Sequence, residues 1–132
     1  MSDEKKEISL SLAQQLIVNY DKGNLLVSAA AGSGKTSVLT ERVKNILSDT
    51  ENSCAVSELL VVTFTRAAAT EMRDRLYLAL HNAALEDKVK SDYLFRQMTL
   101  LPTADICTID SFCAKVVKDN FAAADVDVDF AV

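Results

Sequence analysis

The residues best suited to chemistry form one segment of small residues in the first third of the chain. The segment reads Ala29-Ala30-Ala31-Gly32-Ser33-Gly34-Lys35-Thr36. Small residues let several backbone N–H groups converge on phosphate oxygens, and a helix that follows adds its unpaired N–H donors and the positive end of its dipole. Lys35 would bring a positive charge to the β- and γ-phosphates, and Thr36 a hydroxyl to Mg²⁺. The segment therefore predicts a nucleotide-binding P-loop.

This segment departs from the full P-loop pattern at one position. The pattern G-x-x-x-x-G-K-[ST] begins with glycine, and Ala29 stands there. Alanine does not share the access of glycine to positive φ. The alternative is a Gly/Ser turn beside a solvated lysine, but it does not explain why two of the three glycines of the chain lie within three residues. We therefore assign the segment to nucleotide binding.

The elements that must position this loop alternate between helix and strand. Hydrophobic spacing predicts helices within residues 8–20 and at 35–47, 66–85, 92–101 and 110–121, with strands at 24–28, 58–64 and 105–109. The strand at 58–64 is almost continuously apolar, as expected of a parallel strand covered on both faces. We expect the last helix to bury Phe112, Val116 and Val117. The pattern predicts an α/β fold with a mainly parallel sheet flanked by helices.

Composition excludes several classes of protein. The chain has 132 residues, 49% of them hydrophobic and 25% charged, which is ordinary for one globular domain. Its three cysteines lack C-x-x-C spacing, which argues against a disulfide framework or a zinc site. No apolar run approaches the roughly 20 residues that span a bilayer, so we expect a cytoplasmic protein without a membrane partner. The net charge of −5 is not typical of a free-standing nucleic-acid binder.

Polar residues follow the second and third predicted strands. These turns read Thr63-Phe64-Thr65-Arg66 and Thr108-Ile109-Asp110-Ser111-Phe112. Ligands gather at the carboxyl ends of parallel strands, and hydroxyls beside a guanidinium and an aromatic ring suit a phosphodiester backbone and its bases. The residues alone leave a structural alternative open, in which Thr65 and Ser111 cap helices and both phenylalanines belong to the core. Gln14 likewise could contact an adenine edge or be a solvated helix residue.

Several of these segments resemble a known family when they are taken in order. Gln14, Ala30–Thr36, Val62–Leu76 and Thr108–Cys113 are similar to consecutive motifs of UvrD/Rep-like superfamily 1 DNA helicases. The resemblance covers about residues 9–121, and the ordered combination is more specific than any single motif. Within that superfamily, and with the acidic tail at 125–130, the chain most resembles the AddA-type, RecB-like subunits of bacterial helicase/nucleases.

The resemblance implies a partial RecA-like P-loop NTPase domain that uses ATP and Mg²⁺. It also implies a parent motor that moves on single-stranded DNA and processes double-strand ends for recombinational repair, in partnership with a second, AddB-like helicase/nuclease subunit. By motif, Gln14 would contact adenine, Ala29 to Gly34 would surround the phosphates with Lys35, and Thr36 would hold Mg²⁺. The residues that would face the DNA strand are Thr63, Phe64, Thr65, Arg66, Asp110 and Ser111.

Two of these positions differ from the usual helicase pattern. Arg66 stands where asparagine is usual, and Asp110 where histidine is usual. An arginine can still bind phosphate, whereas a carboxylate would repel it, so we expect Asp110 to cap its helix instead.

The parts of an ATPase that the chain lacks limit what it can do. No acidic Walker B pair follows an apolar strand after the loop, and the alternating acids at 125–129 lack a preceding buried strand. No arginine follows Arg96, so none is available as a late arginine finger. We therefore expect residues 1–132 to be the first part of an N-terminal helicase motor domain, the UvrD-like ATP-binding domain, truncated before Walker B.

Alone, such a fragment should be inactive as an ATPase, and an exposed sheet edge should allow it to pair with another copy. Two alternatives stay open at this point: a UvrD-like helicase without a nuclease, and a small stand-alone P-loop module that binds nucleotide for regulation.

Overall fold

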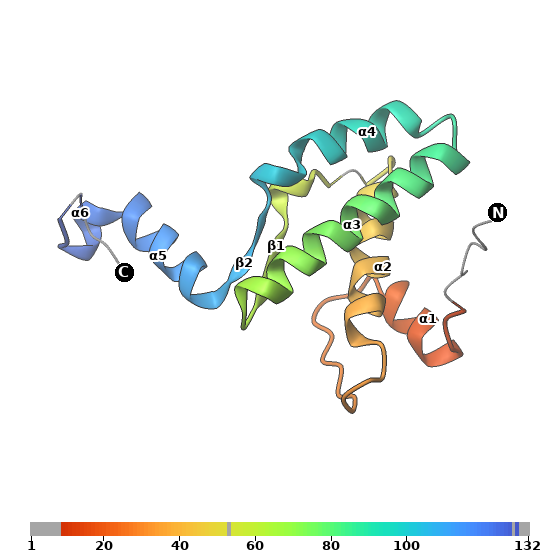
Figure 1. Ribbon diagram of the computed structural model, residues 1–132, viewed down its shortest axis with the longest axis horizontal. Coiled ribbons are helices and arrows are strands. Elements are labelled where there is room, and N and C mark those ends of the chain that lie inside the picture. The colour runs from red at the N-terminus through yellow and green to blue at the C-terminus, as the bar shows by residue number, and fades with distance from the viewer. Residues whose placement is uncertain (1–8, 53, 128, 130–132) are drawn as a thin grey trace.

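Helices cover one face of a small parallel sheet in the computed structural model, which describes residues 9–52, 54–127 and 129 (Figure 1). In chain order the elements are α1 (Leu12–Val18), α2 (Lys35–Ser48), the 3₁₀ helix η1 (Val56–Glu58), β1 (Leu60–Thr63), α3 (Arg66–Glu86), α4 (Ser91–Leu100), the 3₁₀ helix η2 (Leu101–Thr103), β2 (Asp105–Thr108), α5 (Ile109–Asp119) and α6 (Phe121–Ala124). The predicted α/β class with a parallel sheet is confirmed in a helix-rich form. The RecA-like arrangement stays a prediction.

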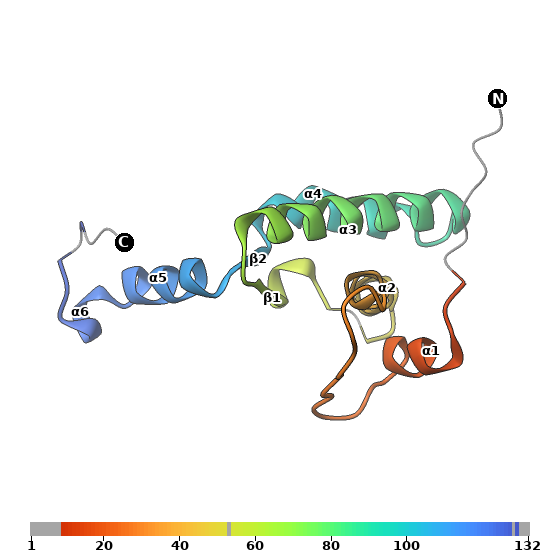
Figure 2. The same cartoon turned by 60° about the horizontal axis from the view of Figure 1, so that its bottom comes forward.

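The core lies between α2, the pair α3 and α4, and one face of the sheet. Helices α3 and α4 lie side by side, and α2 lies against them on the side of the sheet (Figure 2). Leu76 and Leu80 of α3 and Leu94 of α4 are fully buried, and Met72 is 2% exposed. Residues 72, 76 and 80 are four apart, so they form one stripe along α3, as the helical spacing in the sequence predicts.

The sheet consists of two parallel strands in the described part of the chain. Strand β1 pairs with β2 in a register that places Val61 beside Ile106 and Thr63 beside Thr108. Val61 and Ile106 are buried beneath the helices, whereas Leu60 and Val62 on the other face are 48% and 44% exposed. The expectation that this strand is covered on both faces is therefore wrong in this structure. The register also brings the carboxyl ends of both strands to the same edge.

The strand predicted at residues 24–28 is not present. The backbone there has no regular secondary structure, and the side chain of Leu26 is 95% exposed. A strand needs a neighbour to receive its backbone hydrogen bonds, and the described sheet contains only β1 and β2. Leu25 and Val27 still line one pocket, as alternate residues of an extended segment do.

Helices α5 and α6 extend away from the other helices (Figures 1 and 2). No residue of α5 is buried: Phe112 and Val117 are half-buried, and Val116 is 43% exposed. The prediction that these three side chains are buried is wrong, because apolar spacing defines a helix face but not the element that covers it. Among the described residues, no helix has the length and apolar character needed to cross a membrane.

Candidate functional site

The small-residue loop takes up backbone conformations that require glycine at two positions. Gly32 and Gly34 have φ of 77° and 82°. Ala29 does not need this freedom, because Asp125 is the one non-glycine residue with positive φ in the described part of the chain. The departure from the P-loop pattern at Ala29 therefore introduces no backbone strain.

The loop leads directly into the N-terminus of α2, whose first N–H groups have no capping side chain. Gly34 is the N-cap residue, so no side chain caps the helix, and its first turn contains no acidic residue. The first residue is instead Lys35, whose charge is unfavourable at the positive end of a helix dipole unless an anion lies nearby. The free N–H donors and the lysine together fit a phosphate group.

The Lys35 ammonium group folds back over the loop. Its Nζ donates to the carbonyl of Ala29 at 2.9 Å and to that of Ala30 at 3.1 Å. An ammonium group has three donors, so one remains for a ligand. Thr36 next to it is exposed, and its carbonyl accepts a hydrogen bond from Thr40 Oγ1 at 2.9 Å. The residues present fit a nucleotide phosphate and, at the Thr36 hydroxyl, a hydrated Mg²⁺.

Gln14 lies against this loop and is held at both ends of its amide. It forms a capping box with Ser11, in which Oε1 accepts from the Ser11 N–H at 2.8 Å. Its Nε2 donates to the carbonyl of Ser33 at 3.1 Å. A Cβ at Gly34 would lie only 3.3 Å from that Nε2, so the amide packs closely on the loop. The alternative of a merely solvated Gln14 is wrong, while its contact with adenine stays a prediction.

A pocket of about 320 Å³ lies between α1, the loop and α2. Its lining combines polar Gln14 and Lys35 with apolar Ile17, Leu25 and Val27. Arg42 also lines it, although no sequence motif points to this residue. Lys35 and Arg42 are seven residues apart, which is two helical turns and so the same face of α2. That spacing was the signal that could have identified Arg42.

The turn after β1 divides into structural and exposed residues. Thr65 is the N-cap of α3 and accepts from the Ala68 N–H at 3.1 Å, while Thr63 Oγ1 donates to the Thr65 carbonyl at 2.9 Å. The capping role of Thr65 is therefore confirmed. Phe64 is 92% exposed, so the interpretation of Phe64 as a core residue is wrong. Arg66 is exposed beside it.

The turn after β2 contains the N-cap of α5, which differs from the residues predicted to cap this helix. Thr108 is the N-cap of α5: its Oγ1 accepts from the Ser111 N–H at 3.1 Å and donates to Ser111 Oγ at 2.8 Å. The expected capping roles of Asp110 and Ser111 are wrong, because the helix starts earlier, at Ile109. Asp110 lies in the first turn, where a carboxylate is favourable for the helix dipole.

The two turns meet in a groove of about 570 Å³. Phe64 and Arg66 line it from one turn, and Asp110 and Ser111 from the other; Thr63 and Thr65 do not line it. Two further lining residues, Lys115 and Lys118, were missed by the sequence analysis. Their signal is helical spacing, because residues 111, 115 and 118 lie on one face of α5.

Charges of both signs face this groove. Lys115 Nζ contacts the two carboxylate oxygens of Asp105 at 2.6 and 2.8 Å, and this hydrogen bonding raises the pKa of Lys115. Lys118 and Arg66 have no ion pair among the residues that the structure describes, but Asp119 also lines the groove. The groove is therefore only weakly cationic.

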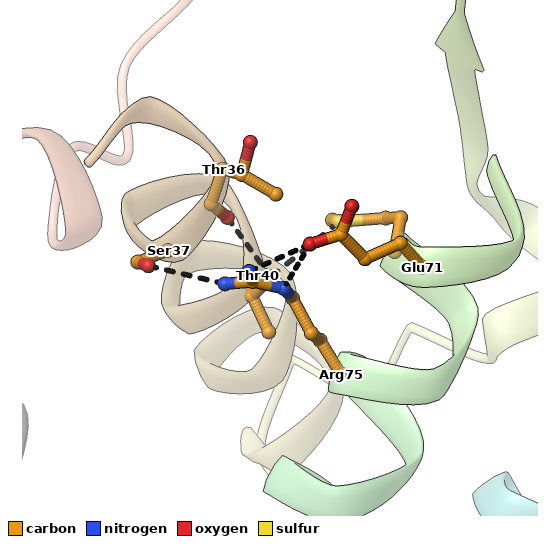
Figure 3. A network of polar contacts seen from close by, with 6 residues as sticks. Thr36, Ser37, Thr40, Glu71 and Arg75 are labelled. Atoms are coloured by element: carbon orange, nitrogen blue, oxygen red, sulfur yellow. Dashed lines mark hydrogen bonds and ion pairs between the residues drawn. The ribbon is translucent and has the colours of Figure 1, made fainter. Parts of the chain in front are cut away.

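Helix α3 also contacts the first turns of α2 (Figure 3). Arg75 donates to Glu71 through Nε at 3.0 Å and Nη2 at 2.6 Å, and through Nη1 to Ser37 Oγ at 3.4 Å. Nearby, the Thr40 hydroxyl donates to the Thr36 carbonyl. Helix α3, which begins at the turn after β1, thus contacts Ser37, the residue next to Thr36.

Comparison with known proteins places the chain in a class. Residues 10–132 match the UvrD/REP helicase N-terminal domain, and the chain belongs to that family.

Within the class, the chain is similar to proteins named as the A subunit of an ATP-dependent helicase/nuclease. It is 50% identical over 119 residues to the protein of Clostridium perfringens (strain SM101 / Type A), a match that covers 90% of this chain and 9% of that protein. It is 52% identical over 119 residues to the protein of Thermoanaerobacter sp. (strain X514), a match that covers 90% of this chain and 10% of that protein. It is 45% identical over 126 residues to the protein of Clostridium novyi (strain NT), a match that covers 96% of this chain and 10% of that protein. The chain spans about a tenth of the length of these curated relatives.

Proposed function

We propose that this chain is the ATP-binding N-terminal part of a bacterial, cytoplasmic DNA helicase/nuclease subunit that unwinds and processes double-strand ends for recombinational repair. The observation that carries the proposal is the uncapped N-terminus of α2, where Lys35 keeps one free donor beside the N–H groups of the first helical turn. The similarity to the A subunits of helicase/nucleases supports the choice of parent protein.

In this proposal the nucleotide lies across the loop. Residues Ala29 to Gly34 surround the phosphates, Lys35 contacts them, and Gln14 contacts the adenine base from α1. Thr36 is a ligand of Mg²⁺, which when bound neutralises part of the phosphate charge. The pocket between α1 and the loop supports this arrangement, because it joins an apolar wall to the Gln14 amide and the Lys35 ammonium.

We further propose that a single strand of DNA lies along the groove between the two turns. Phe64 would stack on a base, and Arg66, Asp110 and Ser111 would border the backbone, with Thr63 and Thr65 shaping the turn behind them. In the parent protein a second, AddB-like subunit would be the partner. Because the net charge is −5 and the groove is nearly balanced, the chain alone should bind single strands weakly at physiological salt. Tight binding there would contradict this part.

The chain alone should not hydrolyse ATP. Its sequence contains no Walker B pair, and the residues proposed to hold nucleotide include no carboxylate. Steady-state phosphate release from ATP is the measurement. Hydrolysis that Lys35→Ala abolishes would show that the 132 residues hold a complete ATPase.

Strand β1 presents an open sheet edge, so we also propose weak self-association of the chain through β1. In the described residues β1 pairs with β2 alone, whereas on β2 the Ile106 carbonyl already accepts from Arg73 Nη2 at 2.8 Å. Sedimentation that shows only monomer at high protein concentration would remove this proposal.

Nucleotide titration tests the central proposal. Calorimetry with ADP, with and without Mg²⁺, should show binding that Mg²⁺ strengthens. Thr36→Val keeps the shape of the side chain and removes the hydroxyl, so it should lose the Mg²⁺ effect and keep the binding measured without the metal. Absence of binding by the unaltered chain at millimolar ADP would contradict the proposal.

A further inference from the structure

Helix α1 carries Gln14 but has little apolar contact with the rest of the molecule. It has only seven residues, and Val18 is its one buried residue. Leu12 and Leu16 are 80% and 74% exposed. A helix of this length is not stable in isolation, so polar contacts must contribute to its position.

Arg42 of α2 supplies such a contact at the C-terminal end of α1. Its Nη1 donates to the carbonyl of Ile17 at 2.8 Å and also to that of Tyr20. The last carbonyls of a helix lack partners within it, and a cation there is favourable for the helix dipole. Helix α1 has no basic residue in its own last turn, so Arg42 takes that role from a different helix. Arg42 is itself half-buried, so its two contacts are partly shielded from water.

The other end of α1 is attached through Gln14, whose Nε2 donates to the Ser33 carbonyl. Both contacts connect α1 to the loop and α2, since Ser33 immediately precedes the N-cap of α2 and Arg42 belongs to α2. Gln14 is therefore held in place from one side by the loop and from the other by Arg42.

We propose that Arg42 is a positioning residue that holds α1, and with it Gln14, against the nucleotide-binding loop. The inference rests on the proposed function, in which Gln14 contacts the base and Lys35 the phosphates. Arg42 follows Lys35 by seven residues, about 10 Å along the helix axis, so it does not share the phosphate site. Ligands with a base should therefore depend on Arg42, whereas ligands made only of phosphate should not.

The test compares two ligands by calorimetry on the full chain: ADP with Mg²⁺, and inorganic tripolyphosphate with Mg²⁺. Arg42→Ala should weaken ADP binding by about tenfold and change tripolyphosphate binding by less than about twofold, where tenfold corresponds to 1.4 kcal/mol. Arg42→Lys should restore part of the ADP affinity, because an ammonium group can donate to the same carbonyls. The matched control is Arg96→Ala, which removes an exposed arginine from α4 and should change neither affinity.

A double variant checks that the effect passes through Gln14. Arg42→Ala combined with Gln14→Ala should bind ADP no more weakly than Gln14→Ala alone, because both changes remove the same contact. Hydrogen exchange gives a measurement without ligand: Arg42→Ala should speed exchange of the amides at 12–18 and leave those at 66–86 unchanged.

Three results would overturn the proposal: equal loss of both ligands, unchanged ADP affinity, or exchange that rises uniformly along the chain. If the unaltered chain binds tripolyphosphate but not ADP, the role of Arg42 fails while the phosphate site stands. If it binds neither, the proposed function itself fails, and the role of Arg42 in it fails too.

Discussion

Replacement of Lys35 by alanine separates the loop as a phosphate site from the loop as a simple turn. In the structure, two of the three ammonium donors are used by the carbonyls of Ala29 and Ala30. A phosphate can therefore be bound by the third donor without breaking either contact. Lys35→Ala removes that donor, its charge and the two contacts within the loop.

The magnitude follows from these contacts. One hydrogen bond to a charged group contributes about 1.5–3 kcal/mol, so ADP affinity should fall roughly ten- to 150-fold. The effect on folding should be small, because Lys35 is exposed and its loss also removes a positive charge from the N-terminus of α2. We expect the midpoint of thermal unfolding to stay within about 3 °C of that of the unaltered chain.

Calorimetry with ADP and Mg²⁺ measures the affinity, and thermal unfolding measures the stability. The control is Lys88→Ala, which removes an exposed lysine from the turn between α3 and α4. Lys90 of the same turn donates to the carbonyl of Ser48, the last residue of α2, so this turn lies at the far end of α2 from the loop. Unchanged ADP affinity in Lys35→Ala, or an equal loss in Lys88→Ala, would refute the reasoning.

The remaining predictions concern stability and side-chain chemistry. Leu76→Ala should lower the free energy of unfolding by about 2–5 kcal/mol, since Leu76 is fully buried, and a loss below about 1 kcal/mol in urea unfolding would contradict this packing. Thr65→Ala should cost about 1 kcal/mol through its N-cap bond, whereas Thr65→Ser should cost much less; equal losses would argue against the cap. Burial, followed by the charge of Glu58, raises the pKa of the Cys54 thiol, so at neutral pH Cys54 should react with a thiol reagent more slowly than exposed Cys113; the reverse order would contradict the structure. Hydrogen bonding to Asp105 raises the pKa of Lys115 above 10.5, so this pair should stabilise the chain at neutral pH and lose its effect as pH rises through the raised pKa. Asp105→Asn should remove this loss of stability at alkaline pH, and a variant that still shows the loss would exclude the pair as its cause.

Features that depend on local contacts were predictable from sequence. The spacing of residues 72, 76 and 80 predicts the buried face of α3, and capping by Thr65 was one of the two alternatives that the residues left open. A cap acts on N–H groups two or three residues ahead, so its effect can be inferred from a short window. The same reasoning pointed to Asp110 and Ser111, which are also good cap residues, and therefore missed Thr108.

Features that depend on distant partners were not predictable. The apolar residues of α5 predict a buried face, yet in the structure Val116 is 43% exposed. The apolar run at 24–28 predicts a strand, yet no strand pairs with it in the described residues. The seven-residue spacing from Lys35 places Arg42 on the same face of α2, but its contact with α1 could not be inferred, since its partners Ile17 and Tyr20 are more than 20 positions away.

The loop therefore forms without the strand that was expected to lead into it. Its two glycine conformations, its lysine and its uncapped helix are set by residues 29 to 36, the segment that we propose binds phosphate. Hydrolysis has a further requirement, a carboxylate that orients water or completes the Mg²⁺ site. No carboxylate lines the pocket between α1 and the loop in the described residues, and Glu71, which lies across from Thr36, is already paired with Arg75 (Figure 3). We therefore expect this chain to bind nucleotide without turnover.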